Sequence, residues 1–308
     1  MITGAGGMLG QYICEQFNDS SVKTLGLRDS SDFRVNLTSE MPDFSGERFS
    51  SVIHCAGTEE DKDAMSLNYE GTKRLLAALE TIPPENFVFI SSYRVYSRDA
   101  GEDLVEETNS WASDETGRSK ALAEDLVKKW CEEKGVTLTI IRPARMFGNG
   151  VKGDSLILFN DAISGKYIHI RGNDARISLV TALDVARAIK KIHKSGGLYN
   201  AADGMNPRFI EMVEAMSANN GAKKRMTHLP AAWAEWLWRL FRWIPSIERN
   251  LSPAVVESRM KTLTLNGSRL AERAGIAYHD TIKVIDHTDS SYPYSFNRPR
   301  KEEIIHEV

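Results

Sequence analysis

The first ten residues contain a glycine-rich segment of the kind that binds phosphate groups. Met1 and Ile2 lead into Thr3-Gly4-Ala5-Gly6-Gly7-Met8-Leu9-Gly10, and an apolar helical pattern follows. Glycines have no Cβ, so backbone N–H groups can approach phosphates closely, and a helix N-terminus adds its positive end. Gly4, Gly7 and Gly10 are three residues apart. The spacing predicts a site for the pyrophosphate of a dinucleotide, and the alternative is a helix-entry turn merely rich in glycine.

The strand that should position this loop is short. Such loops follow strands of about five residues, whereas only Met1 and Ile2 precede Thr3. Two interpretations remain open. Either the natural N-terminus has been lost or misassigned, or the sheet has a short central strand.

Strand and helix patterns alternate through the first two thirds of the chain. We expect strands at 22–27, 51–57, 87–90, 136–141 and 198–200, and helices at 67–79, 119–131 and 183–193. This alternation predicts an α/β fold, a Rossmann-type doubly wound parallel sheet with a smaller, mostly helical C-terminal substrate domain. The dinucleotide-binding domain would comprise residues 1–142 plus about 180–202. Residues 143–179 and 203–290 would form the substrate-binding part, and 291–308 a tail.

The composition is that of an ordinary globular protein. Of 308 residues, 42% are hydrophobic and 26% charged, and the net charge of −3 gives no reason to expect nucleic acid or an anionic membrane. Cys14, Cys55 and Cys131 are odd in number and widely spaced, which indicates neither a disulfide framework nor a metal site. We expect a cytoplasmic protein with no membrane partner and no metal.

Residues 231–244 form a Trp-rich helical pattern. Trp233, Trp236, Leu237, Leu240, Phe241 and Ile244 share one face. A helix lying on a membrane surface has such a pattern. Packing on the chain's own domain is the favoured interpretation.

Several motifs then occur in one order along the chain. They are Thr3-Gly4-x-x-Gly7-x-x-Gly10, His54-Cys-Ala-Gly57, Asn68-Tyr-Glu-Gly71-Thr72, Ser91-Ser92-x-x-Val95-Tyr96, Gly117-Arg-Ser-Lys120, Arg142-Pro143 with Gly148, and Leu183-Asp184-Val-Ala186. Over residues 1–285 the chain resembles the extended short-chain dehydrogenase/reductase family, which includes nucleotide-sugar epimerases, dehydratases and keto-reductases.

The resemblance implies a nicotinamide cofactor, NADP in preference to NAD. NAD-preferring members place an acidic residue at the end of the second strand, where this chain has Gly26-Leu27-Arg28-Asp29. Arg28 could pair with a 2′-phosphate, while Asp29 leaves NAD open. The implied cofactor contacts are Gly4, Gly7, Met8, Leu9, Gly10, Arg28, Asn36, Leu37, Ala56, Gly57, Lys120 and Pro143.

The family's catalytic set is a Tyr, a Lys four residues later, and a Ser from a strand end. Ser92 and Lys120 match, but Thr116 occupies the Tyr position. An aliphatic hydroxyl does not ionise near neutral pH as a phenol can, so three explanations stay open. Another residue could act, the nearby candidates being Asp114, Glu115, Tyr93 and Tyr96. The protein could bind cofactor and sugar without turnover, or the sequence could be a deliberate Tyr→Thr variant.

The resemblance also implies the substrate class and the assembly. A nucleotide-diphosphate sugar is favoured over a steroid- or flavonoid-like ketone, with Ser92, Tyr93, Arg145 and Arg176 as its contacts. The expected activity is that of an epimerase, dehydratase or 4-keto-reductase, and the alternative is a catalytically impaired binding protein. Family members commonly pair through the helices expected here at 67–79 and 119–131, so we expect a homodimer.

Overall fold

The computed structural model describes residues 1–18, 21–97, 99, 101–219 and 226–294. Seven parallel strands form the central sheet in the order β11-β7-β5-β4-β1-β2-β3. They are β1 Ile2–Thr3, β2 Thr24–Gly26, β3 Phe33–Arg34, β4 Ser51–His54, β5 Asn86–Ile90, β7 Thr137–Pro143 and β11 Gly197–Ala201. The predicted doubly wound α/β fold is confirmed, and the two-residue β1 pairs with both β2 and β4.

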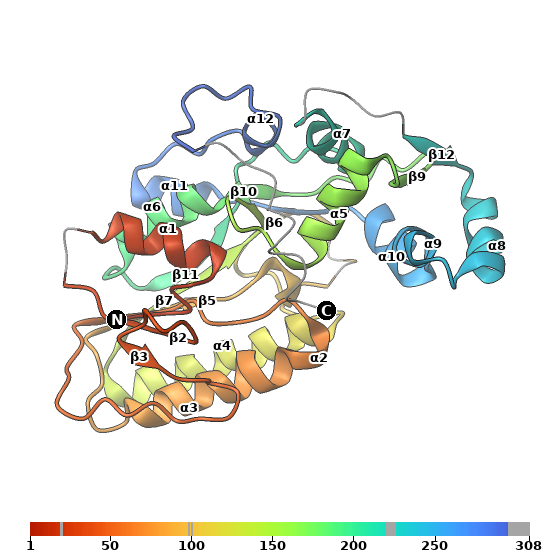
Figure 1. Cartoon of the computed structure of the whole chain (residues 1–308). Helices are drawn as coiled ribbons and strands as arrows, with labels where there is room; N and C mark the ends of the chain where they lie inside the picture. The colour runs from red at the N-terminus through yellow and green to blue at the C-terminus, as the bar shows by residue number, and fades with distance from the viewer. Residues whose placement is uncertain (19–20, 98, 100, 220–225, 295–308) are drawn as a thin grey trace.

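Helices cover both faces of this sheet (Figure 1). On one face lie α1 (Met8–Gln16), α6 (Ala182–Ile192) and α11 (Ser268–Ala274). On the other lie α2 (Asp61–Ala64), the π-helical turn η1 (Met65–Tyr69), α3 (Glu70–Ala78) and α4 (Glu115–Lys134). Asp114 caps α4 by accepting from the Gly117 N–H, and Gly135 ends it in the left-handed conformation.

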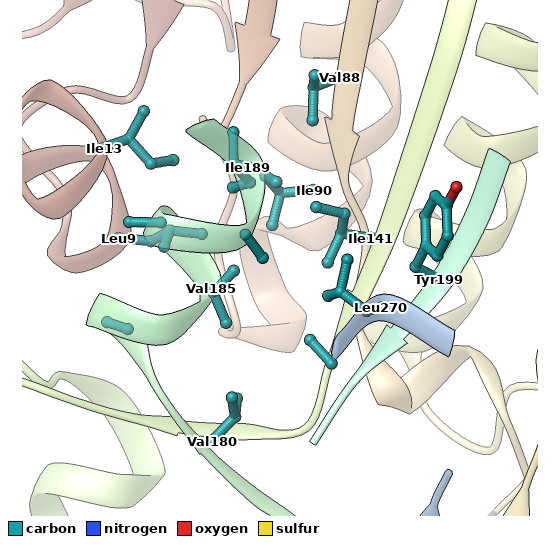
Figure 2. Close-up of a cluster of buried hydrophobic side chains, with 14 of the residues drawn as sticks. Leu9, Ile13, Val88, Ile90, Ile141, Val180, Val185, Ile189, Tyr199 and Leu270 are labelled. Atoms are coloured by element: carbon teal, nitrogen blue, oxygen red, sulfur yellow. The ribbon is translucent and has the colours of Figure 1, made fainter. Parts of the chain in front are cut away.

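Strand β5 shows how one apolar run serves two cores. Val88 and Ile90 point to the α1 and α6 side, where they join Ile13 and Ile189 (Figure 2). Phe87 and Phe89 point to the α3 and α4 side and belong to a second cluster. Because successive side chains of a strand alternate between faces, a strand covered on both sides must be apolar throughout.

The remaining elements form a smaller part beside the carboxyl edge of the sheet (Figure 1). It contains α5 (Gly153–Ser164), α7 (Phe209–Ala218), α8 (Ala231–Phe241), α9 (Pro245–Leu251), α10 (Pro253–Met260) and α12 (Thr281–Ile285). Three two-stranded pairs accompany them: β8 (Arg145–Phe147) with β10 (Leu179–Thr181), β9 (Ile168–Ile170) with β12 (Thr227–Leu229), and β6 (Gly101–Leu104) with β13 (Leu263–Leu265). The predicted domain boundaries stay a prediction, and 295–308 of the predicted tail lie outside the described residues.

The Trp-rich segment is helical and forms α8. We expected its apolar face to pack on the chain's own domain, and for most of that face this is wrong. Trp233, Trp236 and Leu240 are 61%, 59% and 49% exposed. The packed face of α8 is a neighbouring one, on which Ala234 is buried. None of the helices in the described ranges has the length and apolar character needed to cross a bilayer.

A buried ion pair joins α4 to the sheet. Arg142 on β7 donates to both carboxylate oxygens of Glu124, at 2.8 and 2.6 Å, and both side chains are almost fully buried. Arg142 also donates to the Tyr96 hydroxyl at 2.9 Å, and that hydroxyl donates to Asn200 Oδ1 on β11 at 2.9 Å. The network fixes the segment just after β5 relative to α4 and β7.

Neutralising one partner should therefore destabilise the fold. We expect Glu124→Gln to lower the free energy of unfolding by about 3 kcal/mol, because the Arg142 charge is left buried without a counter-charge. Urea unfolding followed by circular dichroism measures this. Glu133→Gln on the same helix is the control, since its pair with Lys129 is exposed and should contribute less than about 0.5 kcal/mol. Equal effects of the two variants would contradict the assignment.

Candidate active site

The segment between β1 and α1 forms a tight turn that requires glycine at two positions. Gly4 has φ +65°, and a Cβ on it would lie 2.6 Å from the backbone nitrogen of Ala56. A Cβ on Gly10 would lie 2.2 Å from the carbonyl oxygen of Gly4. The first turn of α1, which carries Met8 and Leu9, therefore packs directly on the loop. Its N–H groups have no side-chain cap, so the turn fits a dinucleotide pyrophosphate.

Arg28 lies against the same loop, just after β2. A Cβ on Gly6 would be only 2.7 Å from Arg28 Nε. Asp29 instead points to solvent and pairs with Arg34 at 2.8 Å. Arg28, the residue that would favour NADP, therefore lies at the glycine loop, whereas Asp29, the residue that would favour NAD, points away from it.

The other predicted cofactor contacts surround this edge of the sheet. Ala56 and Gly57 directly follow β4, and Pro143 ends β7. Asn36 turns its amide oxygen back to its own loop. Leu37 is buried in the core under α3.

Lys120 is buried on α4 and points toward the end of β5. Its Nζ donates to the carbonyl oxygen of Ile90 at 2.8 Å. A Cβ on Gly57 would lie 2.8 Å from Lys120 Nζ and 2.9 Å from Asn68 Oδ1, so a larger residue at 57 would displace the lysine. Burial lowers the pKa of Lys120 to about 8.

Thr116 is buried, and its hydroxyl is already engaged. Thr116 Oγ1 lies 2.6 Å from Asp61 Oδ1 and 3.1 Å from the Glu59 carbonyl oxygen, and its backbone N–H donates to the same Asp61 oxygen at 3.0 Å. Thr116 thus ties the start of α4 to α2.

Arg94 completes this cluster. Its Nε donates to the Asp114 carboxylate at 3.1 and 3.2 Å, Nη2 to Asp61 at 3.2 Å, and Nη1 to the Glu59 carbonyl oxygen at 3.0 Å. Burial alone would lower the pKa of Arg94, but the charges of Asp114, the Tyr93 phenol and Asp61 raise it.

The four residues suggested as replacements for the phenol fall into different environments. Tyr96 is buried in the Arg142 network, Asp114 caps α4 and pairs with Arg94, and Glu115 forms a surface pair with Arg118. Tyr93, Tyr96 and Asp114 all line one cavity. Ser92 begins the same 3₁₀ turn, η2 (Tyr93–Val95), and its Oγ accepts from the Arg94 N–H at 3.2 Å.

The cavity, of about 250 Å³, lies between this turn and helices α5, α9 and α10. Arg145 and Arg259 both line it. Arg145 donates to Ser155 Oγ, and Arg259 donates to Asn250 Oδ1 and to the Arg249 carbonyl oxygen. Neither arginine pairs with a carboxylate of the described residues. Burial lowers the pKa of Arg259, and the positive charge of Arg145 lowers it further. Two neighbouring cations in this situation suit a dianion such as a diphosphate, although Glu59, Asp114 and Asp154 also line the cavity.

Arg176 is not brought to this cavity. Its side chain is exposed and donates to the Asn206 carbonyl oxygen at 3.0 Å. Ile177 lines the cavity in its place. Sequence reasoning missed Arg94, Arg249 and Arg259. Arg94 lies inside the quoted Ser91–Tyr96 motif and could have been found there, whereas Arg249 and Arg259 lie in a segment without any motif.

Residues 1–202 match the model of the NAD dependent epimerase/dehydratase family. This match spans most of the chain, and the chain belongs to that family. Its cofactor is therefore a nicotinamide dinucleotide, which the glycine turn fits.

Individual relatives are more distant. The chain is 24% identical to N-acetyl-α-D-glucosaminyl-diphospho-ditrans,octacis-undecaprenol 4-epimerase of Escherichia coli O157:H7, over 75% of each chain. Among solved structures, it resembles UDP-glucose 4-epimerase of Thermus thermophilus in complex with NAD (TM-score 0.71, 19% identity, 92% of this chain and 96% of the other). It also resembles RMD of Pseudomonas aeruginosa complexed with NADPH (TM-score 0.69, 20% identity, 94% and 99%).

The lowered pKa of Lys120 has a measurable consequence for stability. The folded chain releases this proton near pH 8, and the unfolded chain near pH 10.4. Between these values the unfolded state binds more protons, so Lys120 makes the free energy of unfolding rise with pH, by up to about 3 kcal/mol. Lys120→Met should remove this rise in urea unfolding experiments across that range. Lys129→Met, an exposed lysine on the same helix, should keep it, and an unchanged slope in Lys120→Met would contradict the assignment.

Proposed function

We propose that this enzyme is a 4-epimerase of sugars that are linked through a diphosphate, with a nucleotide-diphosphate sugar as the leading substrate class. The observation that carries this proposal is the pair Arg145 and Arg259 in one cavity beside the cofactor edge of the sheet, neither with a carboxylate partner among the described residues. The relatives named above as 4-epimerases act on sugar diphosphates, one of them lipid-linked, which makes a polyprenyl-diphosphate sugar the second substrate class. The alternative of a binding protein without turnover is not favoured.

For the cofactor we propose NADP over NAD. Arg28 beside Gly6 supports this choice, since a guanidinium pairs well with a 2′-phosphate. A nicotinamide held there would supply reversible hydride transfer with the sugar. The proposed cofactor contacts are those of the glycine turn together with Arg28, Ala56, Gly57, Lys120 and Pro143.

For the proton transfer we propose that Tyr93 replaces the phenol missing at position 116. Tyr93 lines the cavity, and its hydroxyl has no hydrogen-bond partner among the described residues, whereas that of Tyr96 is bound to Arg142 and Asn200. Tyr93 would remove the proton of a sugar hydroxyl and later return it. Ser92 in the same turn would hold the sugar oxygen, and Lys120 would hold the cofactor ribose. Thr116 keeps a positioning role through Asp61.

We further propose a cytoplasmic homodimer that forms through α3 and α4. These two helices cover the outer side of the sheet together (Figure 1). Leu122 on α4 is 41% exposed, which is consistent with a contact there.

The function is tested by incubating the enzyme with UDP-N-acetylglucosamine or UDP-glucose and NADP or NAD, and following the C4 epimer by NMR. We expect epimerisation, faster with NADP. Arg145→Met should raise KM about 10- to 100-fold, because a charge-assisted contact of about 1.5–3 kcal/mol is lost. Arg176→Met is the matched control and should leave KM unchanged. The proposal would be refuted if neither these two UDP-sugars nor a polyprenyl-diphosphate sugar gave an epimer, or if only Arg176→Met changed KM.

The role of Tyr93 is tested with the same assay. Tyr93→Phe should lower turnover about 10²- to 10⁴-fold, because the proton-transferring group is lost, while cofactor affinity stays the same. Thr116→Val, which removes a hydroxyl that Asp61 already holds, should change turnover less than about tenfold. The reverse pattern, with Thr116→Val inactive and Tyr93→Phe active, would assign the chemistry to position 116.

A further inference from the structure

Helix α8 presents an apolar stripe to solvent. The stripe consists of Trp233, Trp236 and Leu240 on α8 and Trp243 just after it, which are 61%, 59%, 49% and 75% exposed. Their spacing places them on one side of the helix. In Figure 1, α8 lies at the outer edge of the smaller part, far from the central sheet.

The stripe is not the face by which α8 is held. Ala234 is buried in one cluster with Leu251 of α9, and Leu237 and Trp238 pack against that cluster. Trp238 Nε1 also donates to a Glu248 carboxylate oxygen at 2.6 Å. Helix α8 is thus already anchored, and the stripe remains as a second apolar face.

The residue types in the stripe suit the boundary between water and lipid. Tryptophan has an apolar ring body and one N–H, and it concentrates at membrane interfaces for that reason. A helix that lies in the membrane plane combines such an apolar face with neighbouring Arg or Lys side chains. Here three of the four stripe residues are tryptophans.

The charges beside the stripe complement an anionic surface. Helix α8 and its C-cap carry Arg239 and Arg242 against the single acid Glu235. Arg239 pairs with Glu235 at 2.6 Å, whereas Arg242 lies over the Trp238 ring and has no carboxylate partner among the described residues. The helix is therefore net positive, although the whole chain has a net charge of −3.

The area of the stripe argues against a second copy of the chain as its occupant. Four side chains exposed to this degree offer on the order of 500 Å². A stable protein interface buries about 800 Å² on each partner. A bilayer needs no matching protein surface, because binding there follows the buried apolar area and the attraction to anionic lipids.

We propose that α8 docks this enzyme on the surface of an anionic lipid bilayer, with the stripe inserted at the headgroup level. The proposal goes beyond the epimerase activity and holds for either substrate class. Helix α9, which carries Arg249 to the cavity, packs on α8, and α10, which carries Arg259, packs on α9, so docking would bring the cavity's own helices toward the membrane. A lipid-linked diphosphate could then reach Arg145 and Arg259.

The test is co-sedimentation of the full chain with vesicles of phosphatidylcholine, with and without phosphatidylglycerol. We expect binding to the anionic vesicles, weaker at high salt, and at least a tenfold loss in the triple variant Trp233→Ser, Trp236→Ser, Trp243→Ser. Trp111→Ser is the matched control, since Trp111 is 79% exposed but lies outside α8. Circular dichroism and epimerase activity on a soluble substrate check that the variants fold.

Two outcomes would overturn the proposal. One is that the wild-type chain stays in the supernatant, or that the triple variant sediments as well as the wild type. The other is that the triple variant turns a dimer into a monomer in size-exclusion chromatography while vesicle binding is absent in both, which would make the stripe a contact between copies.

Discussion

The pairing of Arg142 with Glu124 is the interaction on which the site depends. It joins β7 to α4 inside the protein, where either charge alone would be costly. Through the Tyr96 hydroxyl it also holds the turn after β5, which carries Ser92, Tyr93 and Arg94. The position of α4 in turn sets the position of Lys120. The cofactor side and the cavity side of the site are therefore fixed by one buried network.

The other constraint is the close contact at the glycine turn. Gly10 approaches the Gly4 carbonyl oxygen so closely that any side chain would displace α1. Such contacts are local, and so are the alternating strand and helix patterns. For this reason the fold and the glycine loop could be predicted from the sequence.

The rest of the site depends on contacts between distant segments. Thr116 meets Asp61 across 55 residues. Arg259 enters a cavity that is also lined by Tyr93 and Arg145, both more than 100 residues earlier in the chain. No local sequence pattern encodes such long-range contacts, so neither the hydrogen bond from Thr116 to Asp61 nor the position of Arg259 in the cavity could be predicted. Arg176 shows the same limit, because its side chain turns to Asn206 rather than to the cavity. For α8 the pattern correctly predicted a helix. The helix has two apolar faces, however, and periodicity alone does not show which of them packs on the protein.

Our central proposal is that the Tyr93 hydroxyl, in the turn after β5, transfers the proton, while Thr116 on α4 only positions α2. The most direct measurement is a crystal structure of the enzyme with NADP and UDP-N-acetylglucosamine bound. We expect the Tyr93 hydroxyl to lie within about 3.2 Å of the sugar's 4-hydroxyl oxygen, with Thr116 still bound to Asp61. A structure in which Thr116 leaves Asp61 to contact that oxygen, with Tyr93 turned away, would contradict it.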